Sequence, residues 1–129
     1  MGFGSAAARD PRTEEILGAA IEVHRELGPG LLESIHEECL CRELKSRGVP
    51  FQRQVPLPIT YKGERLDCDY RVDLVAFDEV VMELKAVEAL LPVHEAQLLS
   101  YMKLLHKRYG LLINFCVPAL KDGIRRRIL

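Results

Sequence analysis

The sequence has little excess charge and no long hydrophobic run. Its 129 residues include 18 basic and 19 acidic side chains, so the net charge is −1. This balance gives the chain none of the overall basic character that marks many nucleic-acid-binding proteins. No apolar run approaches the roughly 20 residues needed to cross a bilayer, so we expect no membrane segment. Hydrophobic residues make up 48% of the chain, which is typical of one globular domain.

The chain also lacks the marks of a secreted or lipid-anchored protein. Residues 1–12 contain no apolar core of a secretory signal, and Ala6 stands where a myristoylation signal needs serine or threonine. We therefore expect a cytoplasmic protein. No internal repeat divides the chain, so we interpret residues 1–12 as a disordered leader or the remnant of a tag, and residues 13–129 as a single domain.

The four cysteines include no Cys-x-x-Cys pair, the spacing typical of zinc and iron–sulfur sites. Cys39 and Cys41 are two residues apart in a predicted helix, so their side chains point to nearly opposite sides. We interpret the cysteines as reduced thiols that partly fill the core. The alternative, an iron–sulfur protein, predicts a brown sample that absorbs visible light.

The spacing of apolar residues predicts the order helix, helix, three strands, helix, strand. The expected elements are helices at 13–27 and 32–47, strands at 51–61, 65–77 and 80–86, a helix at 92–107, a strand at 110–115 and a last strand at 124–129. Thr13 is expected to cap the first helix, and the second is expected to bury an apolar stripe that begins with Leu32 and Ile35. Pro56 and Pro58 place their strand at an edge of the sheet.

The helix at 92–107 predicts a crossover connection. It leads to residues 110–115, a nearly all-apolar run that is typical of a strand covered on both faces. A hairpin sheet extended by such a crossover contains both antiparallel and parallel strands. We therefore expect a mixed α/β (α+β) fold, in which a mixed sheet is flanked by helices and one extra helix precedes the core.

A hairpin that turns at Asp78 would bring two carboxylates together. If the turn is symmetric, Asp73 lies opposite Glu83, and Arg71 lies opposite Lys85. Residues of one face alternate with those of the other, so we assign Arg71, Asp73, Val75, Val81, Glu83 and Lys85 to one face, and Val72, Leu74, Met82 and Leu84 to the opposite, apolar face.

Two carboxylates in this position repel each other. With Cβ atoms about 5 Å apart, the repulsion is about 3 kcal/mol at an effective dielectric constant near 20. That is a sizeable part of the roughly 5–15 kcal/mol that stabilises a small domain, so a proton, a cation or a metal must offset it. One interpretation is a structural ion-pair cluster with Arg71 and Lys85. We favour the other, a site for a hard divalent ion such as Mg²⁺.

Three motifs in the chain resemble one family. Asp73 followed by Glu83-Leu84-Lys85 resembles the D-x(n)-(D/E)xK signature of the PD-(D/E)xK nuclease superfamily. The segment 97–101 (QLLSY) looks like the QxxxY motif of RecB-like members. The segment 30–36 (GLLESIH) is similar to the motif that names the GxxExxY family, although His36 stands where that family has tyrosine. The resemblance covers about residues 13–129 and implies a restriction-endonuclease-like α-β-β-β-α-β core.

The resemblance also implies roles for individual residues. Asp73 and Glu83 would hold Mg²⁺ or Mn²⁺ with the help of a backbone carbonyl on the Glu83 strand. Glu33 is a candidate further ligand, and the alternative is that it is a solvated helix carboxylate. Lys85 would orient or activate the attacking water. Gln97 would help to place the phosphate. The remaining candidates for substrate contacts are His94, Tyr101, His36, Lys103 and Lys107.

These observations predict a metal-dependent nuclease that hydrolyses phosphodiester bonds of DNA or RNA. The alternative is a weakly active or inactive nuclease-like fold that binds nucleic acid or assembles with itself. Residues 89–129 carry seven basic and two acidic side chains, which form either a surface that follows phosphates or a solvated face. We expect a homo-oligomer, although no sequence feature sets the number of subunits.

Overall fold

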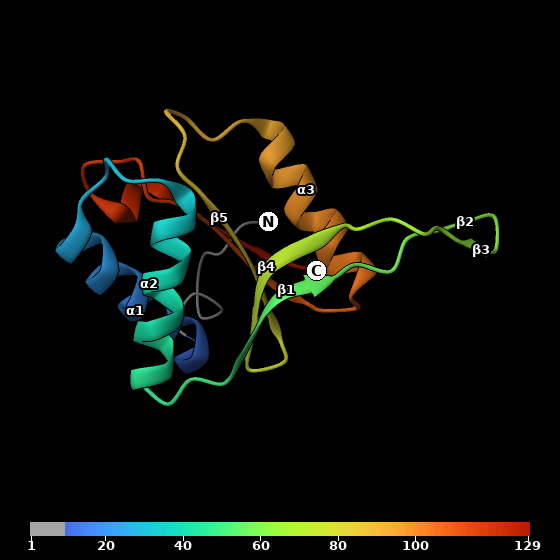
Figure 1. Cartoon of the computed structure of the whole chain (residues 1–129), viewed down its shortest axis with the longest axis horizontal. Coiled ribbons are helices and arrows are strands. Elements are labelled where there is room, and N and C mark those ends of the chain that lie inside the picture. Colours follow the sequence, from blue (N-terminus) through green and yellow to red (C-terminus); the bar gives the residue numbers. More distant parts are fainter. Residues whose placement is uncertain (1–9) are drawn as a thin grey trace.

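The computed structural model describes residues 10–129, in which two helices precede a sheet and a third helix crosses it (Figure 1). The elements are α1 (Pro11–Leu27), α2 (Glu33–Ser46), β1 (Phe51–Pro56), β2 (Thr60–Tyr61), β3 (Glu64–Arg65), β4 (Arg71–Ala76), β5 (Val80–Lys85), α3 (Pro92–Leu104), β6 (Tyr109–Asn114), the 3₁₀ helix η2 (Leu120–Gly123) and β7 (Ile124–Ile128). The leader predicted for residues 1–12 lies mostly outside the described residues.

Five strands form one mixed sheet in the order β1-β4-β5-β6-β7. Strands β5 and β6 run parallel, as the crossover through α3 requires, and the other neighbouring pairs are antiparallel. The predicted fold class is therefore confirmed. Strand β1 lies at an edge, as its prolines predict, and β6 lies between two neighbours with nearly all of its side chains buried.

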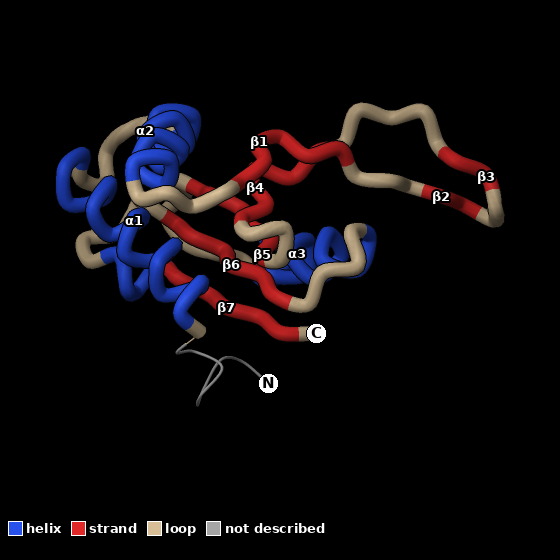
Figure 2. Tube along the Cα trace, turned by 90° about the horizontal axis from the view of Figure 1, so that it is seen from below, coloured by secondary structure: helices blue, strands red, loops and turns tan. Residues whose placement is uncertain are grey.

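Helices cover both faces of the sheet (Figure 2). Helices α1 and α2 share one apolar cluster with the sheet, which includes Leu40, Leu74 and Leu84. Helix α3 shares a second cluster with the other face, which includes Val81 and Met102. No helix in the described range 10–129 is long and apolar enough to cross a membrane.

Both N-terminal helices differ in detail from the prediction. Asp10 caps α1, because its side chain accepts a hydrogen bond of 2.9 Å from the amide of Arg12, whereas Thr13 lies buried inside the helix. Helix α1 therefore begins two residues before the predicted domain boundary. Leu32 and Ile35 are exposed instead of buried. Leu32 only precedes the first turn of α2, and the packed side of that helix consists of His36, Leu40, Cys41 and Leu44.

Two of the predicted strands are each divided. The segment 51–61 splits into β1 and β2, and the segment 65–77 splits into β3 and β4. Pro56 and Pro58 have no amide to donate to a ladder, which explains the first interruption. Strands β2 and β3 form a hairpin that projects from the sheet (Figures 1 and 2), and Lys62 and Gly63 at its turn both have positive φ.

Candidate functional site

The hairpin of β4 and β5 has the predicted register, but its ladder ends where the carboxylates begin. The backbone pairs are Leu74–Met82, Val75–Val81 and Ala76–Val80. Asp73 and Glu83 are instead joined through side chains. Glu83 Oε1 accepts a hydrogen bond of 3.0 Å from the Asp73 amide, and Asp73 Oδ2 accepts one of 2.8 Å from the Leu84 amide. Both carboxylates are therefore fixed at the point where the strands separate.

The neighbouring strand β1 is also irregular beside Asp73. Arg53 pairs with Leu74 and Val55 pairs with Val72, but the pairing skips Gln54, whose φ is +54°. Val72 belongs to the apolar cluster on the α3 face and not to the cluster of Leu74, so the predicted assignment of Val72 was wrong. The strict alternation that the prediction assumed breaks at Asp73, which has no ladder partner on either side.

Burial changes the acidity of both carboxyl groups. Glu83 is 7% exposed and Asp73 is half-buried. Loss of solvent, together with the charge of Asp73, raises the pKa of Glu83 to about 8. The pKa of Asp73 rises to about 6, again mainly through loss of solvent. The charges of Glu37 and Glu33 also raise it, whereas the hydrogen bonds from Leu84 and Gln54 lower it. The pair therefore retains a proton near neutral pH unless a cation takes its place.

Lys85 lies on the same strand face as Glu83, two residues further along β5. It is half-buried, and its charge lowers the pKa of Glu83. Its backbone carbonyl accepts a hydrogen bond of 2.9 Å from the Phe115 amide, which ties the end of β5 to the segment after β6. Within residues 10–129 no carboxylate forms an ion pair with its amine. Its amine is therefore available to an anion.

Helix α2 brings two acidic residues to the same region. Glu33 lies in the first turn, is half-buried, and its charge raises the pKa of both Asp73 and Glu83. Glu37 lies one turn further on and is buried. Its Oε2 atom accepts hydrogen bonds from Arg53 Nε at 2.7 Å and Gln54 Nε2 at 2.9 Å.

The sequence prediction did not include Glu37, Arg53 or Gln54. The four-residue spacing of Glu33 and Glu37 was a signal, because residues four apart share one face of a helix. For Gln54 there was no signal, because its left-handed backbone depends on contacts with segments distant in sequence.

Helix α3 contributes Tyr101 to the site. Its hydroxyl lies 2.9 Å from that of Tyr70, and the two rings meet edge to face at 5.5 Å. Burial and this hydrogen bond raise the pKa of Tyr101, and the charges of Glu83 and Asp73 add to the effect, so the phenol keeps its proton. Gln97, one turn earlier, is half-buried. The ring of His94 accepts a hydrogen bond of 3.0 Å from the Leu91 amide and so caps α3.

The structure does not bring two other predicted residues to the carboxylates. His36 is fully buried, stacks on Phe115 at 4.4 Å and approaches the Gly28 carbonyl at 3.0 Å through Nε2, so its ring is closed to a substrate. Lys107 donates to the carbonyl and the carboxylate of Asp78 at the hairpin turn. That turn is five residues from Asp73, or roughly 16 Å along a strand. Lys103 is exposed on α3.

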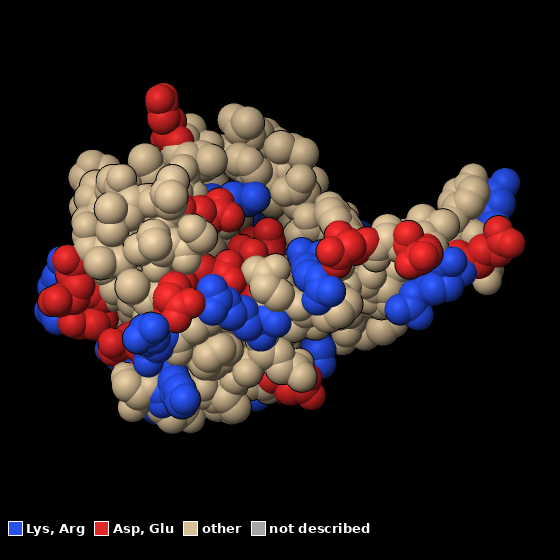
Figure 3. Space-filling view, viewed as in Figure 1, with Lys and Arg blue, Asp and Glu red and all other residues tan. Residues whose placement is uncertain are grey.

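The oxygen donors at this site fit a hard divalent ion. Acidic side chains gather in a hollow beside α2, in the centre of the face shown in Figure 3. Asp73 and Glu83 offer carboxylate oxygens, and a Mg²⁺-type ion is typically held by one or two carboxylates and several waters. In the described part of the chain, no three His, Cys, Asp or Glu side chains lie close enough together to form a metal site. Glu33 therefore does not complete a three-acid group.

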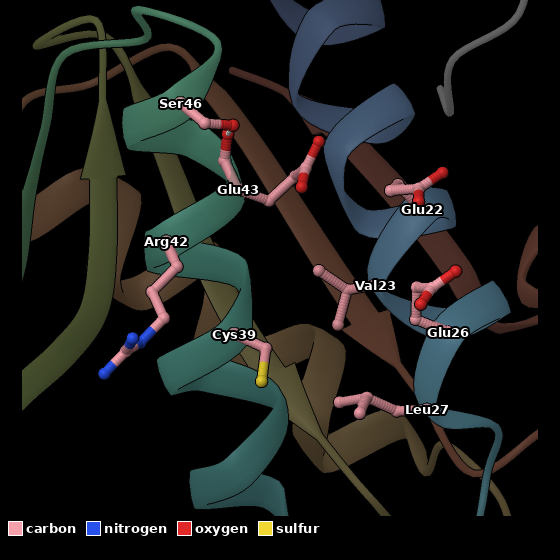
Figure 4. A pocket seen from close by; sticks show the side chains of 8 residues that line it. All are labelled: Glu22, Val23, Glu26, Leu27, Cys39, Arg42, Glu43 and Ser46. Atoms are coloured by element: carbon pink, nitrogen blue, oxygen red, sulfur yellow. Dashed lines mark hydrogen bonds between the residues drawn. The ribbon is translucent and has the colours of Figure 1, made fainter.

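A cavity between α1 and α2 lies apart from these residues (Figure 4). It has a volume of about 290 Å³. Its lining consists of Glu22, Val23, Glu26, Leu27, Cys39, Arg42, Glu43 and Ser46. None of the predicted site residues lines it, so the carboxylates remain the candidate site.

The comparison with known families identifies a superfamily. The family model of the PD-(D/E)XK nuclease superfamily matches residues 10–127, nearly the whole chain. No curated protein matches the chain, and no solved structure does.

Proposed function

Because the chain belongs to the PD-(D/E)XK nuclease superfamily, we propose that it is a metal-dependent nuclease that hydrolyses phosphodiester bonds of DNA or RNA. The observation that carries this proposal is the buried pair of Asp73 and Glu83, with Lys85 on the same strand. We further propose that the chain belongs to the GxxExxY family in the RecB-like branch, on the segments GLLES and QLLSY.

The two carboxylates would hold Mg²⁺ or Mn²⁺. Glu83 Oε1 and Asp73 Oδ2 each accept a hydrogen bond from a backbone amide, and Asp73 Oδ1 accepts one from Gln54, so the lone pairs that these contacts leave free would hold the ion. When bound, such an ion lowers the pKa of a bound water and polarises a phosphoryl oxygen. A divalent charge would also offset the repulsion that keeps a proton on the pair.

Other side chains would act on the phosphate and the water. Lys85 would orient the attacking water and stabilise negative charge that develops on the phosphate, since no carboxylate among residues 10–129 forms an ion pair with its amine. Gln97 would help to place the phosphate. Tyr101 would position that part of α3 through its hydrogen bond with Tyr70.

The test is a cleavage assay with labelled single- and double-stranded DNA and RNA in Mn²⁺. Wild-type protein is compared with Asp73→Ala and Lys85→Ala, and with Lys107→Ala as a control lysine held at the hairpin turn. Loss of cleavage in the first two variants alone supports the proposal. Equal cleavage by all four proteins would identify a contaminant, and no cleavage by wild-type protein would overturn the enzymatic proposal.

A second candidate function is a nuclease-like module that binds nucleic acid or assembles with itself without cleaving. Two observations favour it: no three acidic, His or Cys side chains of the described residues lie close enough to form a metal site, and the net charge is −1. It predicts binding in a gel-shift assay, or a discrete oligomer in sedimentation, from a protein that leaves every substrate intact. Self-association and a cytoplasmic location are predictions under either function.

A further inference from the structure

Gln54 has an unusual backbone for a residue inside a strand. Its φ is +54°, whereas strand residues have φ near −120° to −140°. A glutamine in the left-handed region is strained, because its Cβ atom crowds the neighbouring carbonyl. Such strain persists where the surrounding contacts fix the residue, and it is frequent at functional sites.

The amide nitrogen of Gln54 lies between two carboxylates. It is 2.9 Å from Glu37 Oε2 on α2 and 3.4 Å from Asp73 Oδ1 on β4. A glutamine amide nitrogen carries two N–H groups, and ionised carboxylates only accept hydrogen bonds. The nitrogen, and not the amide oxygen, must therefore face this pair. One nitrogen can then donate to both carboxylates.

Both ends of Gln54 are anchored. Its backbone carbonyl accepts a hydrogen bond of 3.0 Å from Arg71 Nη1. The carboxylate of Glu37 is buried and is held in turn by Arg53 Nε at 2.7 Å. Gln54 therefore connects a fixed point on α2 to the Asp73 carboxylate.

We propose that Gln54 is a positioning residue that sets the orientation of the Asp73 carboxylate for the divalent ion. Asp73 Oδ2 is fixed by the Leu84 amide, and the Gln54 amide restrains the remaining oxygen. The two oxygens of a carboxylate turn together about the Cβ–Cγ bond, so without the Gln54 contact the group is restrained only at Oδ2, and the ion meets a less firmly oriented ligand. This inference rests on the proposed metal-dependent function.

The test uses Gln54→Gly and Gln54→Asn. Glycine and asparagine both accept a positive φ, so neither variant adds backbone strain, and neither side chain can bridge from β1 to both carboxylates. Gln52→Ala, at an exposed position of the same strand, is the control. For each protein we would measure Mn²⁺ affinity by calorimetry, the melting temperature in EDTA, and kcat and KM for cleavage.

We expect Mn²⁺ affinity to fall about tenfold or more in both Gln54 variants, in line with the loss of other residues that orient metal ligands. The melting temperature in EDTA should fall only slightly, because relief of the backbone strain offsets part of the lost hydrogen bond to the buried Glu37 carboxylate. The value of kcat should fall, and KM for nucleic acid should stay unchanged. Gln52→Ala should match wild-type protein in every measurement. Unchanged Mn²⁺ affinity in both Gln54 variants would overturn the positioning role, and so would a melting temperature so low that the variants are unfolded where Mn²⁺ binding is measured. A wild-type protein that binds no Mn²⁺ would instead overturn the proposed function.

Discussion

Asp73 and Glu83 are each held by the backbone of the opposite strand. The Glu83 carboxylate accepts a hydrogen bond from the Asp73 amide. The Asp73 carboxylate accepts one from the amide of Leu84, the residue that follows Glu83. These two side chains take the place of the next backbone pair of the hairpin. Because backbone amides orient one oxygen of each group, the acidic pair is prearranged before any ligand arrives, at the expense of removing two carboxyl groups from solvent, one of which keeps a proton near neutral pH.

The first prediction concerns pH. The pKa of Glu83 is raised to about 8 in the folded protein, above the ordinary glutamate value of the unfolded chain. The folded state therefore binds more protons than the unfolded state between these values, so the stability that Glu83 contributes is greatest below pH about 4.5 and is lost as the pH rises through about 8. Metal-free wild-type protein should lose roughly 2–4 kcal/mol of stability from this group, since one pKa unit is about 1.4 kcal/mol.

Urea unfolding in EDTA at pH 5.5 and pH 8.5 measures this loss. Glu83→Gln keeps the shape of the side chain and removes the titration, so its stability should change much less between the two pH values. A wild-type stability that stays level, or that rises toward pH 8.5, would contradict the prediction.

The second prediction concerns divalent ions. An ion must displace the proton held by Asp73 and Glu83, so Mn²⁺ should bind more tightly at pH 8 than at pH 6. At an ion concentration 100 times Kd the stabilisation should be about 2.7 kcal/mol. Melting curves with and without EDTA measure it. Asp73→Asn should lose the stabilisation, and an equal response of this variant would place the ion elsewhere.

The third prediction distinguishes the role of Lys85 in catalysis from metal binding by the carboxylates. Lys85→Gln keeps a polar side chain but removes the charge, so kcat should fall by about 10²–10³. Mn²⁺ binding should be retained, because the carboxylates are intact. Lys107→Gln should leave both measurements unchanged. Loss of Mn²⁺ binding in Lys85→Gln would show that the lysine acts through the acidic pair and not on the reacting phosphate.

The fourth prediction concerns the buried acid of α2. Arg53→Ala removes the charged partner of Glu37, a residue that is 6% exposed. We expect a loss of about 1–3 kcal/mol, because an unpaired buried charge is costly while Arg53 itself is partly solvated. Arg42→Ala breaks an exposed pair with Glu38 on the same helix and should cost about 0.5 kcal/mol or less. Urea unfolding distinguishes the two, and equal losses would contradict the assigned role of burial.

Local patterns were sufficient to predict the order of the elements and the register of the β4–β5 hairpin. Alternation about a short turn fixes which residues face one another, and so Asp73 and Glu83 could be paired without coordinates. The pattern could not foresee that the backbone ladder would end there. That change depends on β1, where Gln54 departs from regular strand geometry. Its side chain there donates a hydrogen bond to Glu37 on α2, a contact between residues distant in sequence.

His36 illustrates the same limit. Its place in the motif predicted a residue at the site, whereas in the structure its ring is buried against Phe115 and lies within 3.0 Å of the Gly28 carbonyl. Side-chain accessibility is a tertiary property, and residue order in one motif does not determine it.

The projecting β2–β3 hairpin has a practical consequence. Every residue from 60 to 70 is exposed, and the base of the hairpin is closed by a backbone hydrogen bond of 2.8 Å from Leu57 to Tyr70. Trypsin should therefore cut at Lys62 or Arg65 while the two fragments stay associated through the β1–β4 pairing. A nicked molecule of this kind offers a permissive position for a short tag or a fluorescent label at the tip.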